Sequence, residues 1–115
     1  MRSPITTHVL DTSRGRPATG IHVVLDFHEE GTRWKTIASG VTNADGRISD
    51  LLPENTKLAT GIYRLTFDTA SYFHNNETEG FYPSVTVMFE IRDPGAHYHV
   101  PLLLSPYGYS TYRGS

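Results

Sequence analysis

The feature that most constrains this chain is a period-two recurrence of apolar residues. Every second residue from Ile21 to Phe27 is apolar, and the same holds from Val85 to Ile91. A β-strand directs successive side chains to opposite faces, so this pattern predicts half-buried strands. Five further segments have the composition of strands: Ile5 to Asp11, Arg33 to Val41, Ile62 to Asp68, His97 to Leu104 and Tyr107 to Tyr112.

Clusters of Gly, Pro, Asn and Asp separate these segments at short spacing. Seven or eight short strands divided by such turns are typical of a β-sandwich. The one credible helix is a short one around Thr69 to Asn76. No linker, repeat or low-complexity segment is evident, and 115 residues suffice for one hydrophobic core. We therefore expect a single all-β domain over residues 1–115.

The charge distribution excludes some classes of partner. The chain has a formal charge of -2, with both signs scattered, and lacks the basic stripe of a nucleic-acid-binding protein. The longest apolar run, Val100 to Leu104, is far shorter than the roughly 20 residues of a membrane-spanning helix. The first residues, Met1 to Ile5, lack the apolar core of a signal peptide. We expect a cytoplasmic protein without nucleic acid or membrane partners.

The absence of cysteine limits the available chemistry. It excludes disulfides and thiol nucleophiles, and it leaves His, Asp and Glu as side-chain metal ligands. His97 and His99 have a spacing that can bind a metal from one face of a strand, because alternate residues project together. No third ligand is evident nearby, so a metal site is not expected.

Two blocks of sequence resemble a known family. Residues 98–115 read YHVPLLLSPYGYSTYRGS, residues 8–18 read HVLDTSRGRPA, and shorter matches cover residues 42–47 and 61–65. Over essentially its whole length the chain resembles the transthyretin-like family. Its ending, Tyr112 to Ser115, resembles the 5-hydroxyisourate hydrolase branch of that family, as distinct from the branch of hormone carriers.

This resemblance implies a transthyretin-like (prealbumin-like) antiparallel β-sandwich of seven to eight strands with one short helix. It also implies a homotetramer in which two dimers enclose a central channel. The implied activity is that of a cyclic amide hydrolase in purine catabolism. It would convert 5-hydroxyisourate to 2-oxo-4-hydroxy-4-carboxy-5-ureidoimidazoline, towards allantoin, without a metal or organic cofactor.

The resemblance makes neighbours of the strands near residues 5–11, 97–104 and 107–112. Alternation within each strand then assigns seven residues to one outward face: His8, Leu10, His99, Pro101, Leu103, Ser110 and Tyr112. The other side of the 97–104 strand, Tyr98, Val100, Leu102 and Leu104, is uniformly apolar and should point into the core. A monomer would expose the Leu and Pro of the outward face, so we expect a second subunit to cover it.

His8 and His99 are the candidates for acid/base catalysis, because imidazole titrates near neutral pH. Arg47 follows a turn, and its guanidinium can hold ring carbonyls and stabilise an oxyanion. The match to the hydrolase branch implies catalytic roles for these three residues. It also implies substrate contacts for His8, Arg47, Tyr112 and Ser115. The sequence does not decide which His is the general base.

The chain stops at the end of a predicted strand, so we expect residues 112–115 to complete the site. Ser115 offers a hydroxyl and a carboxylate, either of which can orient His8 or His99. Arg113 can contact the substrate or form an ion pair with a neighbouring subunit, and the sequence does not separate these roles.

Two other functional classes are alternatives. A small-ligand carrier with the same fold would have an apolar channel without the His pair. An adhesion or carbohydrate-binding module would be favoured by a secretion signal or an exposed aromatic row, and neither is visible in the sequence.

Overall fold

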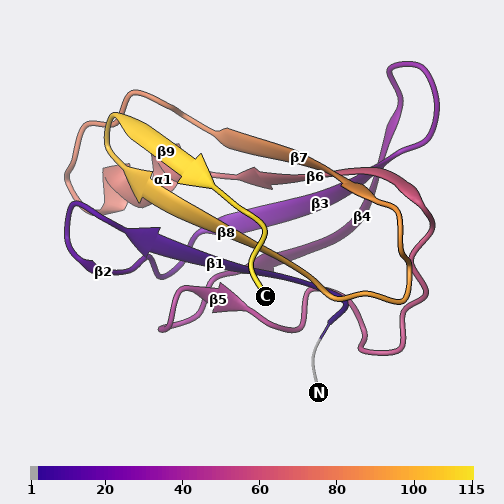
Figure 1. The fold of residues 1–115 in the computed structure, drawn as a ribbon. Coiled ribbons are helices and arrows are strands. Elements are labelled where there is room, and N and C mark those ends of the chain that lie inside the picture. The colour runs from indigo at the N-terminus through magenta and orange to yellow at the C-terminus, as the bar shows by residue number, and fades with distance from the viewer. Residues whose placement is uncertain (1–2) are drawn as a thin grey trace.

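Two β-sheets pack face to face in this protein (Figure 1). The computed structural model describes residues 3–115. The elements within those residues are β1 (Ile5–Asp11), β2 (Arg16–Pro17), β3 (His22–His28), β4 (Trp34–Val41), β5 (Arg47–Ile48), β6 (Gly61–Phe67), α1 (Thr69–Asn75), β7 (Val85–Ile91), β8 (Tyr98–Ser105) and β9 (Gly108–Thr111). Sheet A has the strand order β2-β1-β8-β9, with β5 also paired to β1, and sheet B has the order β4-β3-β6-β7.

The predicted β-sandwich with one short helix is confirmed. Seven of the strands coincide with the expected segments to within one residue at each end, as does the helix. The two-residue strands β2 and β5 were not predicted, because two residues are too few to show alternation. Across residues 3–115 no helix is long and apolar enough to span a membrane.

The strands β1 and β8 run parallel at the centre of sheet A, whereas every other strand pair described within residues 3–115 has the expected antiparallel direction. Their register pairs Thr6 with His99 and His8 with Pro101. Parallel neighbours cannot be joined by a tight hairpin and need a long connection. Here that connection contains the whole of sheet B, and the pattern within a single strand carries no information about it.

The hydrophobic core lies between the two sheets and draws residues from both. Val9 on β1 and Leu65 on β6, for example, are fully buried. The inward set predicted for the β8 segment is buried as expected: Tyr98, Val100, Leu102 and Leu104. Burying one large apolar side chain contributes about 1.5–3 kcal/mol. The core therefore determines which faces of β1 and β8 point outward.

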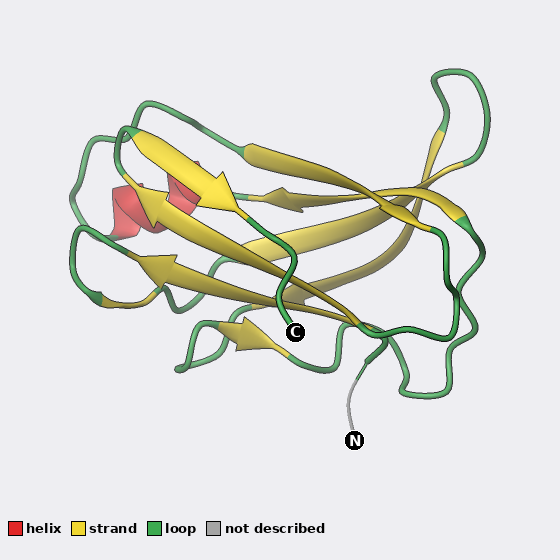
Figure 2. Ribbon diagram, in the orientation of Figure 1, coloured by secondary structure: helices red, strands yellow, loops and turns green. Residues whose placement is uncertain are grey.

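A buried hydrogen bond connects α1, at one end of the sandwich (Figure 2), to the end of β1. The Tyr72 hydroxyl donates to Oδ2 of Asp11 at 2.6 Å, and Oδ1 accepts from the backbone N–H groups of Ser13 and Arg14. Burial raises the pKa of Asp11, but a hydrogen bond from the Ser13 hydroxyl to Oδ1 at 2.6 Å, together with these other hydrogen bonds, outweighs burial and holds the pKa below its usual value. Burial, followed by the bond to Asp11, raises the pKa of Tyr72 to about 12.

Replacing Tyr72 with Phe should lower the free energy of unfolding by about 1.5–3 kcal/mol, because the lost hydrogen bond has a charged acceptor. Tyr63→Phe is the matched control, since the Tyr63 hydroxyl donates to the neutral carbonyl of Ala59 at 2.7 Å. That variant should lose about 0.5–1.5 kcal/mol. Urea unfolding at one protein concentration measures both values. Equal losses of unfolding free energy in the two variants would contradict the argument that the charged acceptor, Asp11, makes the Tyr72 hydrogen bond the stronger one.

Candidate active site

Three strands of sheet A bring His8, Arg47 and His99 to one outward face. The antiparallel pairing of β1 with β5 sets Arg47 opposite His8. The parallel pairing of β1 with β8 sets Thr6 opposite His99, so His8 and His99 are one diagonal step apart. Strand spacing and rise put the Cβ atoms of such residues about 8 Å apart. Both imidazoles and the guanidinium can therefore contact one small molecule.

The turn before Arg47 fixes where that side chain begins. Oδ1 of Asn43 accepts hydrogen bonds from the backbone N–H groups of Asp45 and Arg47, at 2.9 and 3.0 Å. Gly46 has a φ of +73°, and its carbonyl accepts from the N–H of Val9 at 2.7 Å. A side chain at Gly46 would be strained by this φ and would also meet the Val9 carbonyl. The sequence Asn-Ala-Asp-Gly thus fixes the turn against β1 and delivers Arg47 beside His8.

The surroundings of His8 favour its neutral form. Burial lowers its pKa below the usual value, and the positive charge of Arg47 lowers it further. The backbone and the carboxylate of Asp45 act in the opposite direction but do not outweigh these effects. A histidine with a lowered pKa is neutral at pH 7 and is able to accept a proton.

The C-terminal segment packs directly on His99. The N–H of Gly114 donates to the carbonyl of His99 at 2.9 Å, which forms an isolated bridge beside β8. A Cβ atom added to Gly114 would lie 2.5 Å from Cδ2 of His99 and 3.3 Å from Cγ. Only glycine allows the backbone to approach the imidazole this closely. Sequence reasoning did not single out Gly114, whose only signal was its place in the terminal motif.

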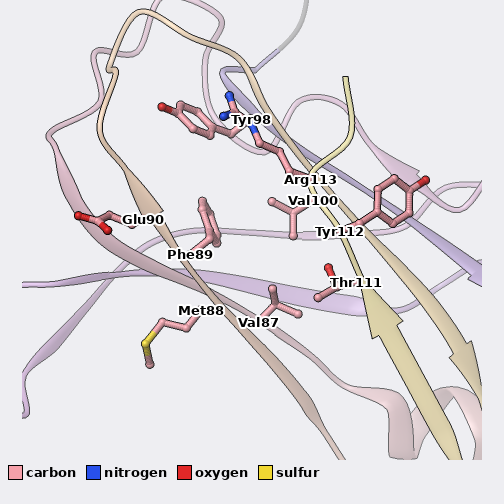
Figure 3. A pocket seen from close by; sticks show the side chains of 9 residues that line it. All are labelled: Val87, Met88, Phe89, Glu90, Tyr98, Val100, Thr111, Tyr112 and Arg113. Atoms are coloured by element: carbon pink, nitrogen blue, oxygen red, sulfur yellow. The ribbon is translucent and has the colours of Figure 1, made fainter.

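The neighbours of Gly114 point in different directions. Figure 3 shows the Arg113 side chain turned toward Tyr98 and the Tyr112 ring pointing to the opposite side. The guanidinium carbon of Arg113 lies 4.5 Å from the centroid of the Tyr98 ring. Arg113 therefore has a contact within its own chain. Tyr112 and Ser115 are both exposed, and their substrate contacts stay predictions.

A cavity of about 250 Å³ opens at the edge of the sandwich, between β7 and the strands β8 and β9 (Figure 3). Its wall is partly apolar and includes Val87 and Val100, together with Tyr112 and Arg113. The residues that line it do not include His8, His99 or Arg47. Of the seven residues assigned to the outward face, Tyr112 alone also lines this cavity, so the cavity adjoins that face but lies apart from His8, His99 and Arg47.

Metal-ligand geometry is not found among the described residues. Within residues 3–115, no three His, Asp or Glu side chains are grouped as ligands of one metal ion. The candidate pair His97 and His99 is linked through the hydroxyl of Thr6, which contacts a ring nitrogen of each. The arrangement on this face is suited to proton transfer and to holding an anionic oxygen.

Known proteins are similar to this chain in sequence over nearly all of its length. The sequence model described as the HIUase/Transthyretin family matches residues 5–114. The chain belongs to this family. Within the family, the 5-hydroxyisourate hydrolase of Salmonella typhimurium is 46% identical over 111 residues, which cover 96% of this chain and 80% of that protein.

Two solved structures show that the family fold serves more than one purpose. The 5-hydroxyisourate hydrolase of Klebsiella pneumoniae is 39% identical with a TM-score of 0.83, covering 96% of this chain and 98% of that one. Sea bream transthyretin in complex with thyroxine is 34% identical with a TM-score of 0.89, covering 96% and 94% of the two chains. Since the fold is common to both, the functional conclusion has to rest on the site.

Replacing Gly114 with Ala should displace the imidazole of His99, because the new methyl group cannot fit against Cδ2. We expect a change in the Hδ2 and Hε1 NMR shifts of His99 and a loss of about 1–3 kcal/mol in unfolding free energy, as for other overpacked sites. Gly108→Ala is the matched control, since its Cβ would meet nothing closer than 3.7 Å. Unchanged His99 shifts in the Gly114 variant would show that the segment does not hold the ring.

Proposed function

We propose that this protein hydrolyses 5-hydroxyisourate to 2-oxo-4-hydroxy-4-carboxy-5-ureidoimidazoline, a step in the degradation of urate towards allantoin. The observation that carries the proposal is the juxtaposition of His8 with Arg47, and of both with His99, on the outward face of sheet A. The Salmonella relative with the hydrolase name, at 46% identity, supports the enzyme over a small-ligand carrier.

In the proposed mechanism His8 is the general base. Its lowered pKa keeps it neutral, so it can take a proton from water as the water oxygen bonds to a carbonyl carbon of the six-membered ring. The carbonyl oxygen then carries negative charge, which the guanidinium of Arg47 stabilises. Collapse of this intermediate breaks the cyclic C–N bond, and His99 supplies the proton that the departing nitrogen needs. The product is a ring-opened carboxylate.

Tyr112 and Ser115 complete the proposed site as substrate contacts. The Tyr112 ring points to the side opposite the Arg113 side chain (Figure 3). Residues that alternate along an extended chain project to opposite sides, so Tyr112 shares the side of the sheet opposite to Arg113. From there its hydroxyl can donate to, or accept from, polar atoms of the ring. No metal or organic cofactor is required by these steps.

We further propose a homotetramer in which the outward faces of sheet A line a central channel. In their sheets β7 and β9 are terminal strands, so each has a backbone edge available to another subunit. Two large side chains on these strands, Met88 and Tyr109, are 61% and 43% exposed. On the outward face, Leu10 and Leu103 lie opposite each other beside the His pair, as apolar surface that a second dimer can cover. A cytoplasmic location stays the prediction from the sequence.

His8→Asn and His99→Asn should each lower turnover by about 10²–10⁴-fold, the usual contribution of general acid/base catalysis. The ultraviolet decay of freshly generated 5-hydroxyisourate, corrected for its spontaneous decay, measures turnover. Sedimentation equilibrium should give wild type and both variants four times the chain mass, which separates a chemical defect from a disassembled protein. Near-full turnover in both variants would refute the assignment of the two residues. A wild-type protein that leaves the decay unchanged would instead favour the carrier.

A further inference from the structure

The hydroxyl of Thr6 lies between the imidazoles of His97 and His99. Its Oγ1 is 2.8 Å from Nδ1 of His99 and 3.1 Å from Nε2 of His97. The two rings are nearly parallel, with an interplanar angle of 16° and centroids 6.4 Å apart. Thr6 is only 4% exposed, although it belongs to the outward side of β1. Water therefore cannot readily replace either hydrogen bond.

A single hydroxyl couples the protonation of the two rings. It carries one hydrogen, so it donates to one ring nitrogen and accepts from the other. In a neutral imidazole one nitrogen is a donor and the other an acceptor. The direction of the bridge therefore fixes the tautomers of His97 and His99 together.

We infer that Thr6 is a positioning residue for His99, in a relay that runs from Nδ1–H of His99 to Oγ1 of Thr6 and from the Thr6 hydroxyl to Nε2 of His97. This inference rests on the proposed function. With Nδ1 holding a proton, Nε2 is the atom of His99 that exchanges a proton with the substrate. With this direction of the hydrogen bonds, Nδ1 of His99 keeps its proton in both states of the ring. It does so when the ring is charged and acts as the acid, and when the ring is neutral after Nε2 has given its proton to the substrate. The reverse direction would confine Nδ1 of His99 to accepting.

The surrounding backbone holds this relay in place. Thr6 and His99 are direct partners in the β1–β8 register, so their Cα atoms lie opposite each other. Threonine is branched at Cβ and has few χ1 rotamers, which limits the positions of its hydroxyl. Gly114 packs on Cδ2 of the same imidazole. The ring of His99 is thus held by Thr6 at one nitrogen and by the terminal segment at a carbon.

Thr6→Val tests the relay, because valine keeps the shape of threonine and removes the hydroxyl. We expect kcat for 5-hydroxyisourate to fall by about 10- to 100-fold, the effect of a misplaced catalytic group, with KM changed by less than about twofold. Thr6→Ser keeps the hydroxyl and should recover most of kcat. Thr7→Val is the matched control, since the Thr7 hydroxyl donates to the carbonyl of Val100 on the core side of β1. It should lower stability and leave kcat near the wild-type value.

Nitrogen-15 NMR of the imidazoles tests the relay without an activity assay. Near neutral pH the wild-type protein should show Nδ1 of His99 protonated and Nε2 of His97 as an acceptor. His97→Phe keeps an aromatic ring and removes that acceptor, so it should shift the His99 tautomer in the same direction as Thr6→Val. It also serves as the second variant if Thr6→Val does not fold.

The outcomes separate the relay from the proposed function. Wild-type kcat in Thr6→Val, with His8→Asn inactive, would overturn the relay and leave the hydrolase standing. An unprotonated Nδ1 in wild-type His99 would overturn the relay whatever the activity. Equal loss in Thr6→Val and Thr6→Ser would show that the size of the residue matters and not its hydroxyl, which also overturns the relay. If the wild-type protein has no activity, the proposed function fails, and the NMR measurement still decides the hydrogen-bond direction.

Discussion

The site depends on the register of β1 between β5 and β8. Side chains alternate along a strand, so a slip of one residue would turn His8 into the core and Val9 outward. One buried side chain and one buried hydrogen bond on the core side of β1 oppose such a slip. Val9 is fully buried, and the Thr7 hydroxyl donates to the carbonyl of Val100 at 2.7 Å. Core packing on one face of β1 therefore determines which side chains the candidate site receives on the other face.

This arrangement gives two histidines different surroundings on one scaffold. His8 lies beside a guanidinium, whose charge adds to burial in lowering its pKa. His99 instead contacts a hydroxyl through Nδ1 and a glycine backbone through Cδ2. Groups whose surroundings differ in this way are suited to separate acid and base roles. The difference comes from the elements that reach each residue, the β5 turn for one and the terminal segment for the other.

Local periodicity was sufficient to predict most of the fold. The β7 segment, with apolar residues at Val85, Val87 and Ile91, shows why: its core side can be read directly from the order of residues. The parallel pairing of β1 and β8 could not be read in this way, because it joins segments separated by the whole of sheet B. The strand β5 is only two residues long, so its pairing with β1 left no pattern to detect.

The candidate site was predictable to a similar degree. Resemblance to a family indicated His8, Arg47 and His99, and alternation gave the two histidines a common face. Thr6 was overlooked because threonine is common in strands and its partners lie 91 and 93 residues away in the sequence. Such contacts become visible only when the strand register is known. Gly114 escaped notice for the same reason, since its importance lies in what its missing side chain would touch.

The most direct test of this account is a crystal structure of the protein with an inert purinone analogue of 5-hydroxyisourate. We predict that the analogue lies on the outward face of sheet A, within hydrogen-bond distance of His8, Arg47 and His99. That face should line a channel between two dimers. An analogue bound in the edge cavity beside Val87 and Val100, with His8, Arg47 and His99 untouched, would contradict the account.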